Sequence, residues 1–170
     1  TLPQRLSDFR LVMGRHVHPS ARPYTLSTPL FTDYALKDRW LYLPPGTQLK
    51  WQGDGLPEFP LGSVLVKTFA YPADMRAPDK DVRKLETRLL IKRSSGWVAL
   101  PYVWLPDGSD AVLKRAGQRM DVSWVHTDGS ARSSSDAVPN VNQCKGCHES
   151  GGVLTPIGPK ARNLTQQLGA

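Results

Sequence analysis

The sequence predicts a mainly β protein, an antiparallel meander that packs as a sandwich or an open barrel. Three observations support this fold class. Short apolar and β-branched runs recur through the middle of the chain, turns rich in glycine and proline separate them, and no long stretch has helical periodicity. With 14 glycines and 15 prolines among 170 residues, the composition favours many turns and few long helices.

The elements follow from the chain in order. Residues 1–28 are expected to be irregular, because prolines interrupt any helix longer than a turn or two, and a short helix is expected at most over 5–13. The predicted strands cover 40–43, 64–71, 83–93, 97–105, 111–115 and 120–125.

The segment 83–93 has the clearest alternation of apolar and charged side chains. One face is expected to carry Leu85, Thr87, Leu89 and Ile91. The charged residues between them are expected mostly on the other face. Ser94-Ser95-Gly96 is typical of a hairpin turn, so 97–105 is predicted to return antiparallel to 83–93.

The chain is expected to form one packed domain in three parts: a β-rich body with an irregular start (1–126), a polar linker or loop (127–142) and a C-terminal segment with a short helix (143–170). With 39% hydrophobic and 22% charged residues, the composition is that of a globular protein. No apolar run reaches the ~18–20 residues of a membrane span.

The C-terminal segment contains the pentapeptide Cys144-Lys145-Gly146-Cys147-His148. C-x-x-C-H is the attachment signature of c-type haem, in which each cysteine forms a thioether and the histidine becomes an axial iron ligand. The chain has only these two cysteines, so no disulfide framework competes for them. The sequence therefore predicts one covalent haem c on Cys144, Cys147 and His148.

Two other interpretations of the cysteine pair stay open. A reversible disulfide, as in thioredoxin-like proteins, lacks the βαβ context that such a motif expects. A zinc site completed by His16 and His18 needs histidines more than 100 residues away from the cysteines.

The sixth iron ligand is not fixed by the pattern. The candidates are Met75, Met120, His126 and Lys67, with Met13, His16 and His18 as weaker ones. Each has an ordinary alternative: a core methionine, a surface histidine, or a lysine that extends its amine to solvent.

Other side chains near the predicted haem have two interpretations. Tyr102 and Trp104 share one strand face and are candidates for haem contact, although a sandwich core accounts for them equally well. Glu86 and Arg88 form either a cross-strand ion pair, which is favoured, or a distal acid and base.

The net charge is +7, and Lys145, Lys160 and Arg162 surround the motif. This basic rim predicts an acidic redox partner. No nucleic-acid-binding motif accompanies the charge, so nucleic acid is not expected as a partner. Covalent haem is installed outside the bacterial cytoplasm, so the protein is expected to be exported, for example to the periplasm.

Several stretches, in order, resemble a family of largely uncharacterised exported bacterial c-type cytochromes. They are Pro29 to Arg39, Leu43 to Gly46, Phe59 to Gly62, Lys67 to Phe69, Leu85 to Leu90, Gly96 to Trp104, Cys144 to His148 and Gly158 to Leu164. The resemblance covers most of 24–164 and implies haem and export, without a secure activity. Members often continue into a second C-x-x-C-H region, so the chain is expected to be a single-haem form or a fragment of a longer protein.

Two further likenesses bear on the site. Gly158-Pro159 to Leu164 resembles the Gly-Pro-x-Leu stretch of small class I c-type cytochromes, where the proline carbonyl accepts the N–H of the axial histidine. This resemblance makes Pro159 the candidate acceptor and Pro156 the reserve. A β-rich body before a C-terminal C-x-x-C-H is also similar to the cytochrome P-460 group, which oxidises small nitrogen compounds or binds gases at an open iron.

The sequence thus favours a mono-haem cytochrome that transfers electrons outside the cytoplasm. A haem enzyme or gas-binding protein with an open distal site is the alternative, and a zinc-stabilised binding domain is a remote one. The sequence does not decide whether the protein is an enzyme.

Overall fold

A computed structural model describes residues 2–13, 16–26, 35–140, 149–150 and 153–156 of the chain. Its main element is a six-stranded antiparallel sheet in the order β3-β4-β5-β6-β7-β8, so each strand pairs with its neighbours along the chain. The strands are β3 (Ala21–Pro23), β4 (Leu36–Tyr42), β5 (Val64–Pro72), β6 (Val82–Arg93), β7 (Gly96–Trp104) and β8 (Ala111–Leu113). This order confirms the mainly β meander, and β3 and β8 are separate edges, so the described sheet is not a closed barrel.

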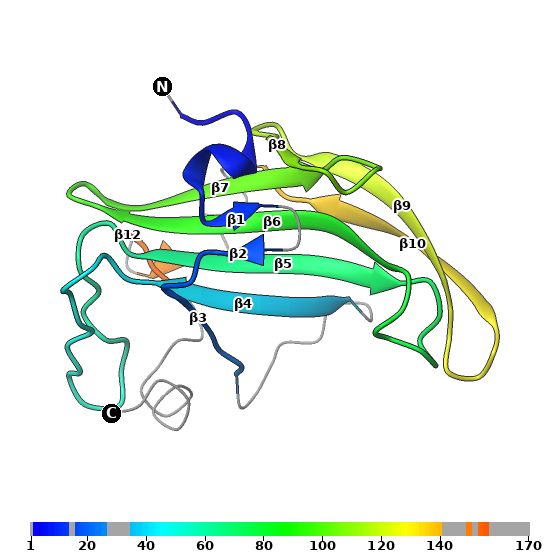
Figure 1. The fold of residues 1–170 in the computed structure, drawn as a ribbon, viewed down its shortest axis with the longest axis horizontal. Coiled ribbons are helices and arrows are strands. Elements are labelled where there is room, and N and C mark those ends of the chain that lie inside the picture. The colour runs from blue at the N-terminus through cyan, green and yellow to red at the C-terminus, as the bar shows by residue number, and fades with distance from the viewer. Residues whose placement is uncertain (1, 14–15, 27–34, 141–148, 151–152, 157–170) are drawn as a thin grey trace.

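Smaller elements lie around the sheet. They are the 3₁₀ helix η1 (Leu6–Phe9) and the strand pairs β1 (Val12–Met13) with β2 (His16–Val17), β9 (Gln118–Val125) with β10 (Ala131–Val138), and β11 (Glu149–Ser150) with β12 (Val153–Leu154). In Figure 1, η1, β1 and β2 lie in front of the sheet, whereas β10 and β12 lie behind it. We call these two sides the front face and the back face.

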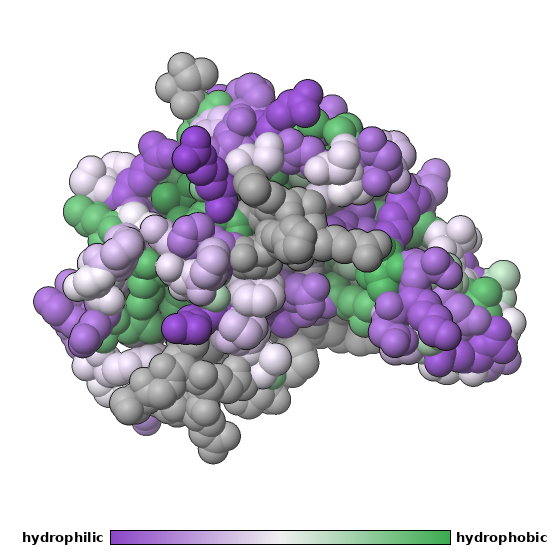
Figure 2. Space-filling model, viewed as in Figure 1, coloured by the Kyte–Doolittle hydropathy of each residue, from purple (hydrophilic) through white to green (hydrophobic). Residues whose placement is uncertain are grey.

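Alternation along each strand gives the two faces different contents. The front face buries one hydrophobic core against η1. Its main members are Leu6, Leu11, Val64, Val66, Leu89, Ile91, Leu100, Tyr102, Trp104, Ala111 and Leu113. This placement confirms the predicted common face of Leu89 and Ile91, and the surface over this core is a mixture of hydrophilic and hydrophobic residues (Figure 2).

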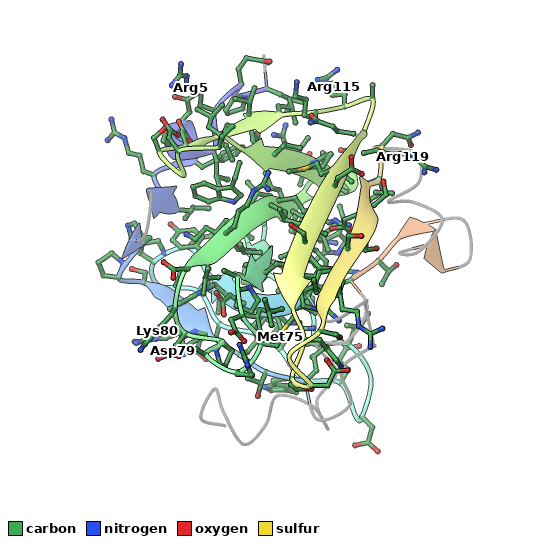
Figure 3. The ribbon with its side chains drawn as sticks, turned by 90° about the vertical axis from the view of Figure 1, so that its right-hand side faces the viewer. Arg5, Met75, Asp79, Lys80, Arg115 and Arg119 are labelled. Atoms are coloured by element: carbon green, nitrogen blue, oxygen red, sulfur yellow. The ribbon has the colours of Figure 1, made fainter. Side chains whose placement is uncertain are left out.

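The back face carries two smaller clusters. One joins Tyr24, Leu41, Phe59 and Leu65, and the other joins Tyr71, Leu85, Val122 and Trp124. The second cluster exists because β9 and β10 fold across the end of the sheet, as Figure 3 shows. Met75 lies beside this hairpin, and its backbone N–H donates to the Val125 carbonyl at 2.8 Å.

Leu85 is not on the face that the alternation predicts. Phe69 pairs with Glu86 and Ala70 with Lys84, so Leu85 is the extra residue of a β-bulge in β6. The bulge places Leu85 in the back cluster while Leu89 stays in the front core. A bulge is invisible to a strict two-residue period, which explains the difference.

Residues 127–142, expected to be a polar linker or loop, contain β10. β10 pairs with β9 along its full length, from Ala131 opposite Val125 to Val138 opposite Gln118. Its serines are compatible with a strand because one face of this hairpin is exposed to water, so apolar residues are not needed at alternate positions. The turn at Asp128-Gly129 joins the two strands, and the Asp128 carboxylate accepts the Ser130 N–H at 2.8 Å.

Other boundaries differ by a few residues. β4 begins at Leu36 rather than at residue 40, because its charged first half pairs with β5 as far as Ala70. The start of the chain, expected to be irregular, forms η1 and the short strands β1 to β3. In the part of the chain that the structure describes, no helix has the length and apolar character needed to cross a membrane.

Candidate functional site

A row of three basic residues crosses the back face of the sheet. Lys67 of β5 lies directly opposite Arg39 of β4 on one side and opposite Arg88 of β6 on the other. Side chains directly opposite each other in an antiparallel pair have Cβ atoms about 4.5–5.5 Å apart, and like charges in such positions are destabilising. We call Arg39, Lys67 and Arg88 the cationic row.

The aromatic ring of Phe69 supports two members of the cationic row. The Lys67 amine lies 4.7 Å from the ring centroid and the Arg88 guanidinium carbon lies 4.5 Å from it. Phe69 itself is buried. A desolvated ring face attracts cations, so Phe69 holds both charges near one point of the sheet.

Glu86 is the carboxylate of this site, and it is only 1% exposed. It lies opposite Phe69 and directly after the bulge residue Leu85. Arg88 Nε forms an ion pair with Glu86 Oε1, and the Oε2 atom has no hydrogen-bond partner among the described residues. The favoured interpretation of an ion pair is confirmed, but the two residues lie on the same strand and not on two strands.

Burial and neighbouring charges shift the pKa values of both Lys67 and Glu86. Desolvation, followed by repulsion from Arg39, Arg88 and Lys37, lowers the pKa of Lys67 to about 8. Desolvation raises the pKa of Glu86 to about 7, and the attraction of Arg88 only partly opposes this. Both groups are thus held near the point where they exchange protons at neutral or mildly alkaline pH.

The β9–β10 hairpin closes one side of this site. Asp136 of β10 acts on the carboxyl of Glu86 and contributes to its raised pKa. Met120 lies opposite Asp136 in the hairpin, and both Met120 and Met75 pack against the cluster of Leu85 and its neighbours. Two of the candidate thioether ligands therefore lie on the back face, at the end that carries Tyr71 and Leu85.

Tyr102 and Trp104 lie on the opposite face of the sheet. The Tyr102 hydroxyl donates to the Pro3 carbonyl at 2.9 Å, and Trp104 Nε1 donates to Thr87 Oγ1 at 2.9 Å. Both rings belong to the front core, so these contacts account for their burial. Their contact with a haem stays a prediction.

The remaining candidates are spread over the molecule. His126 lies at the turn of the β9–β10 hairpin, and its backbone N–H donates to the Ser130 carbonyl. His18 accepts the Ser20 N–H on Nδ1 and contacts the ring of Tyr42. Pro156 is buried.

The predicted attachment residues Cys144, Cys147 and His148 lie outside the described residues, as do Pro159, Lys145, Lys160 and Arg162. The described chain stops at Asn140 and resumes at Glu149. Within the described part, no group of three or more His, Cys, Asp and Glu residues could hold a metal ion.

The sequence reasoning did not single out Arg39, Phe69 or Asp136 as site residues. Arg39 and Asp136 lay in segments that were not assigned to strands, so their faces could not be assigned. The segment Leu36–Tyr42 carries its charged residues together in its first half, so no alternation of charged and apolar residues marked the face of Arg39. For Asp136 the available signal was the Asp128-Gly129 pair, which is typical of a hairpin turn and would have paired the following residues with 118–125.

Comparison with known protein families, curated protein sequences and solved structures finds no match to this chain.

Proposed function

We propose that the protein is a mono-haem c-type cytochrome that transfers electrons outside the cytoplasm, with its haem on Cys144, Cys147 and His148. The single observation that carries the proposal is the C-x-x-C-H pentapeptide in a chain with no other cysteine. The finer architecture belongs to the same proposal: residues 143–170 form a short-helical haem-binding segment, with Pro159 accepting the N–H of His148.

The described structure supports this proposal by what lies on the back face. β10 precedes the motif in the chain, β11 follows it, and β10 and β12 both lie behind the sheet (Figure 1). The same face offers Lys67, Met75 and Met120, whose amine and thioether groups suit a sixth iron ligand. The residues present therefore fit a haem, which would supply one-electron chemistry at the iron.

Export and an acidic redox partner are parts of the proposal that rest on the chain alone. The haem attachment chemistry requires a compartment outside the cytoplasm. The net charge of +7 favours a partner of opposite charge, which a basic surface attracts over a distance.

The test is covalent haem in protein produced together with a c-type haem attachment system. We expect haem staining that persists on a denaturing gel, and its loss in Cys144→Ala/Cys147→Ala. Lys145→Ala, which changes a position between the two cysteines, is the matched control and should keep the stain. A wild-type protein without stain, or a double variant that retains it, contradicts the assignment.

One observation favours the alternative of a haem enzyme or gas-binding protein. Glu86 is buried with a pKa of about 7, as a distal proton donor or acceptor requires. Optical spectra separate the two functions. A band near ~695 nm in the oxidised protein indicates methionine ligation and electron transfer, whereas a high-spin spectrum that shifts with carbon monoxide indicates an open iron.

A further inference from the structure

The cationic row contains an arginine that is buried without a partner. Arg39 is 8% exposed, and its backbone carbonyl accepts the Tyr24 N–H, but among the described residues its guanidinium makes no hydrogen bond and no ion pair. The carboxylate of Asp38 and the hydroxyl of Tyr24 act on it only through the longer-range field. A guanidinium has five N–H donors, and those of Arg39 are not among the fully buried atoms that lack a partner, so in the described part of the chain they remain accessible to a ligand.

The Lys67 amine likewise has no hydrogen-bond or ion-pair partner among the described residues. Its only described contact is the ring of Phe69, and it stands between Arg39 and Arg88. A lysine on a sheet ordinarily extends its amine into water, but this amine is desolvated enough to lose proton affinity.

The carboxylates of the site do not balance the row. Glu86 pairs with Arg88, and it lies diagonally from Lys67 across the strand pair. That leaves Arg39 and Lys67 as adjacent cations without a facing carboxylate in the described part of the chain. A negatively charged hydrogen-bond acceptor beside β4 and β5 would balance these two cations.

We propose that Arg39 and Lys67, with Arg88 beside them, form a binding site for a small oxyanion of the phosphate or carboxylate class. The planar guanidinium of Arg39 matches two oxygens of such a group, and the Lys67 amine adds a point charge beside it. The oxyanion supplies the missing acceptors and relieves the repulsion along the row. Tyr24 lies beside this arginine, because its backbone N–H donates to the Arg39 carbonyl at 3.0 Å.

Two sources supply this chemistry. A free anion enters from solvent, or the carboxylate side chains of a covalently attached haem fill the site from within the molecule. The second source rests on the proposed function, whereas the first does not. The cysteine-free variant separates them, because it keeps the site and removes the haem.

The experiment is isothermal titration with inorganic phosphate at constant ionic strength, on the haem-loaded protein and on Cys144→Ala/Cys147→Ala. Binding to both forms identifies a free anion, and binding to the cysteine-free form alone identifies the haem carboxylates as the occupant. Arg39→Gln should weaken phosphate binding about tenfold to a hundredfold, as expected for lost charge-assisted hydrogen bonds. Arg93→Gln, at an exposed arginine of the same sheet, is the matched control and should bind as the parent does.

Absence of phosphate binding in both forms overturns the proposal, and so does equal binding by Arg39→Gln and its parent. Because Arg39→Gln can lose its fold, a second measurement begins with the unaltered sequence and uses a different variant for comparison. Phosphate should raise the unfolding temperature more than chloride at equal ionic strength, and Lys67→Gln should remove that excess. Should the protein carry no haem at all, the proposed function fails while the phosphate titration still decides this inference.

Discussion

Replacing Glu86 by glutamine tests the buried carboxyl of the site. Burial raises the pKa of Glu86 from 4.5 to about 7, whereas in the unfolded chain the group is solvated. The groups that face it are Arg88 on its own strand, Lys67 on β5 and Asp136 on β10. Glutamine has the same shape as the protonated acid but cannot ionise.

The sign of the effect follows from proton binding. Between pH 4.5 and about 7 the folded protein binds the Glu86 proton more tightly than the unfolded chain does. The stability from this group is therefore fully present below pH 4.5 and is lost as the pH rises to about 7. Each tenfold change in proton affinity corresponds to about 1.4 kcal/mol, so the loss amounts to about 3 kcal/mol.

The assay is urea unfolding followed by tryptophan fluorescence at several values between pH 4 and pH 8. Relative to wild type, Glu86→Gln should gain about 3 kcal/mol in free energy of unfolding as the pH rises across this range. Glu58→Gln makes the same change at an exposed position, and its curve should keep the wild-type slope. Parallel curves for wild type and Glu86→Gln would refute the reasoning, because the carboxyl would then be solvated in the folded protein.

Three further substitutions test the packing of the fold. Gly117→Ala should cost about 2 kcal/mol or more, because φ is +75° and the new Cβ would lie 2.6 Å from the Val138 carbonyl oxygen, as urea unfolding will measure. Leu85→Ala should cost about 2–5 kcal/mol in the same assay, because the bulge residue is fully buried. Tyr102→Phe should lower the free energy of unfolding by about 1 kcal/mol, because the hydrogen bond to the Pro3 carbonyl is lost.

Each of these three expectations would be contradicted by a particular result. Gly53→Ala is the control for Gly117→Ala, because φ of Gly53 is +64° but no atom lies within 4 Å of the new Cβ. An equal loss of stability in the two variants would show that the clash with the Val138 carbonyl oxygen does not contribute. A loss below about 1 kcal/mol in Leu85→Ala would show that the back cluster is loosely packed. No loss in Tyr102→Phe would show that the hydroxyl finds water as readily as the Pro3 carbonyl.

Much of the sheet was predictable because local chemistry and global pairing agree there. The alternation in β6, the Ser94-Ser95-Gly96 turn and the apolar run of β5 placed three central strands within a residue or two of their observed bounds. β10 differs from the expectation because its serine-rich sequence has the composition of a linker. The Asp128-Gly129 pair between β9 and β10 is a common hairpin signal that would have found it.

The sequence alone determined the meander and supplied C-x-x-C-H, the motif on which the proposed function rests, because side-chain period and cysteine spacing are local properties. Only the tertiary structure decided that Arg39, Lys67 and Arg88 form one row and that Glu86 is buried beside them. Those relations depend on strand register, and a shift of one residue would place these side chains on the other face. The charge environment of the site therefore depends on how β4, β5 and β6 pair, which the sequence of a single strand does not specify.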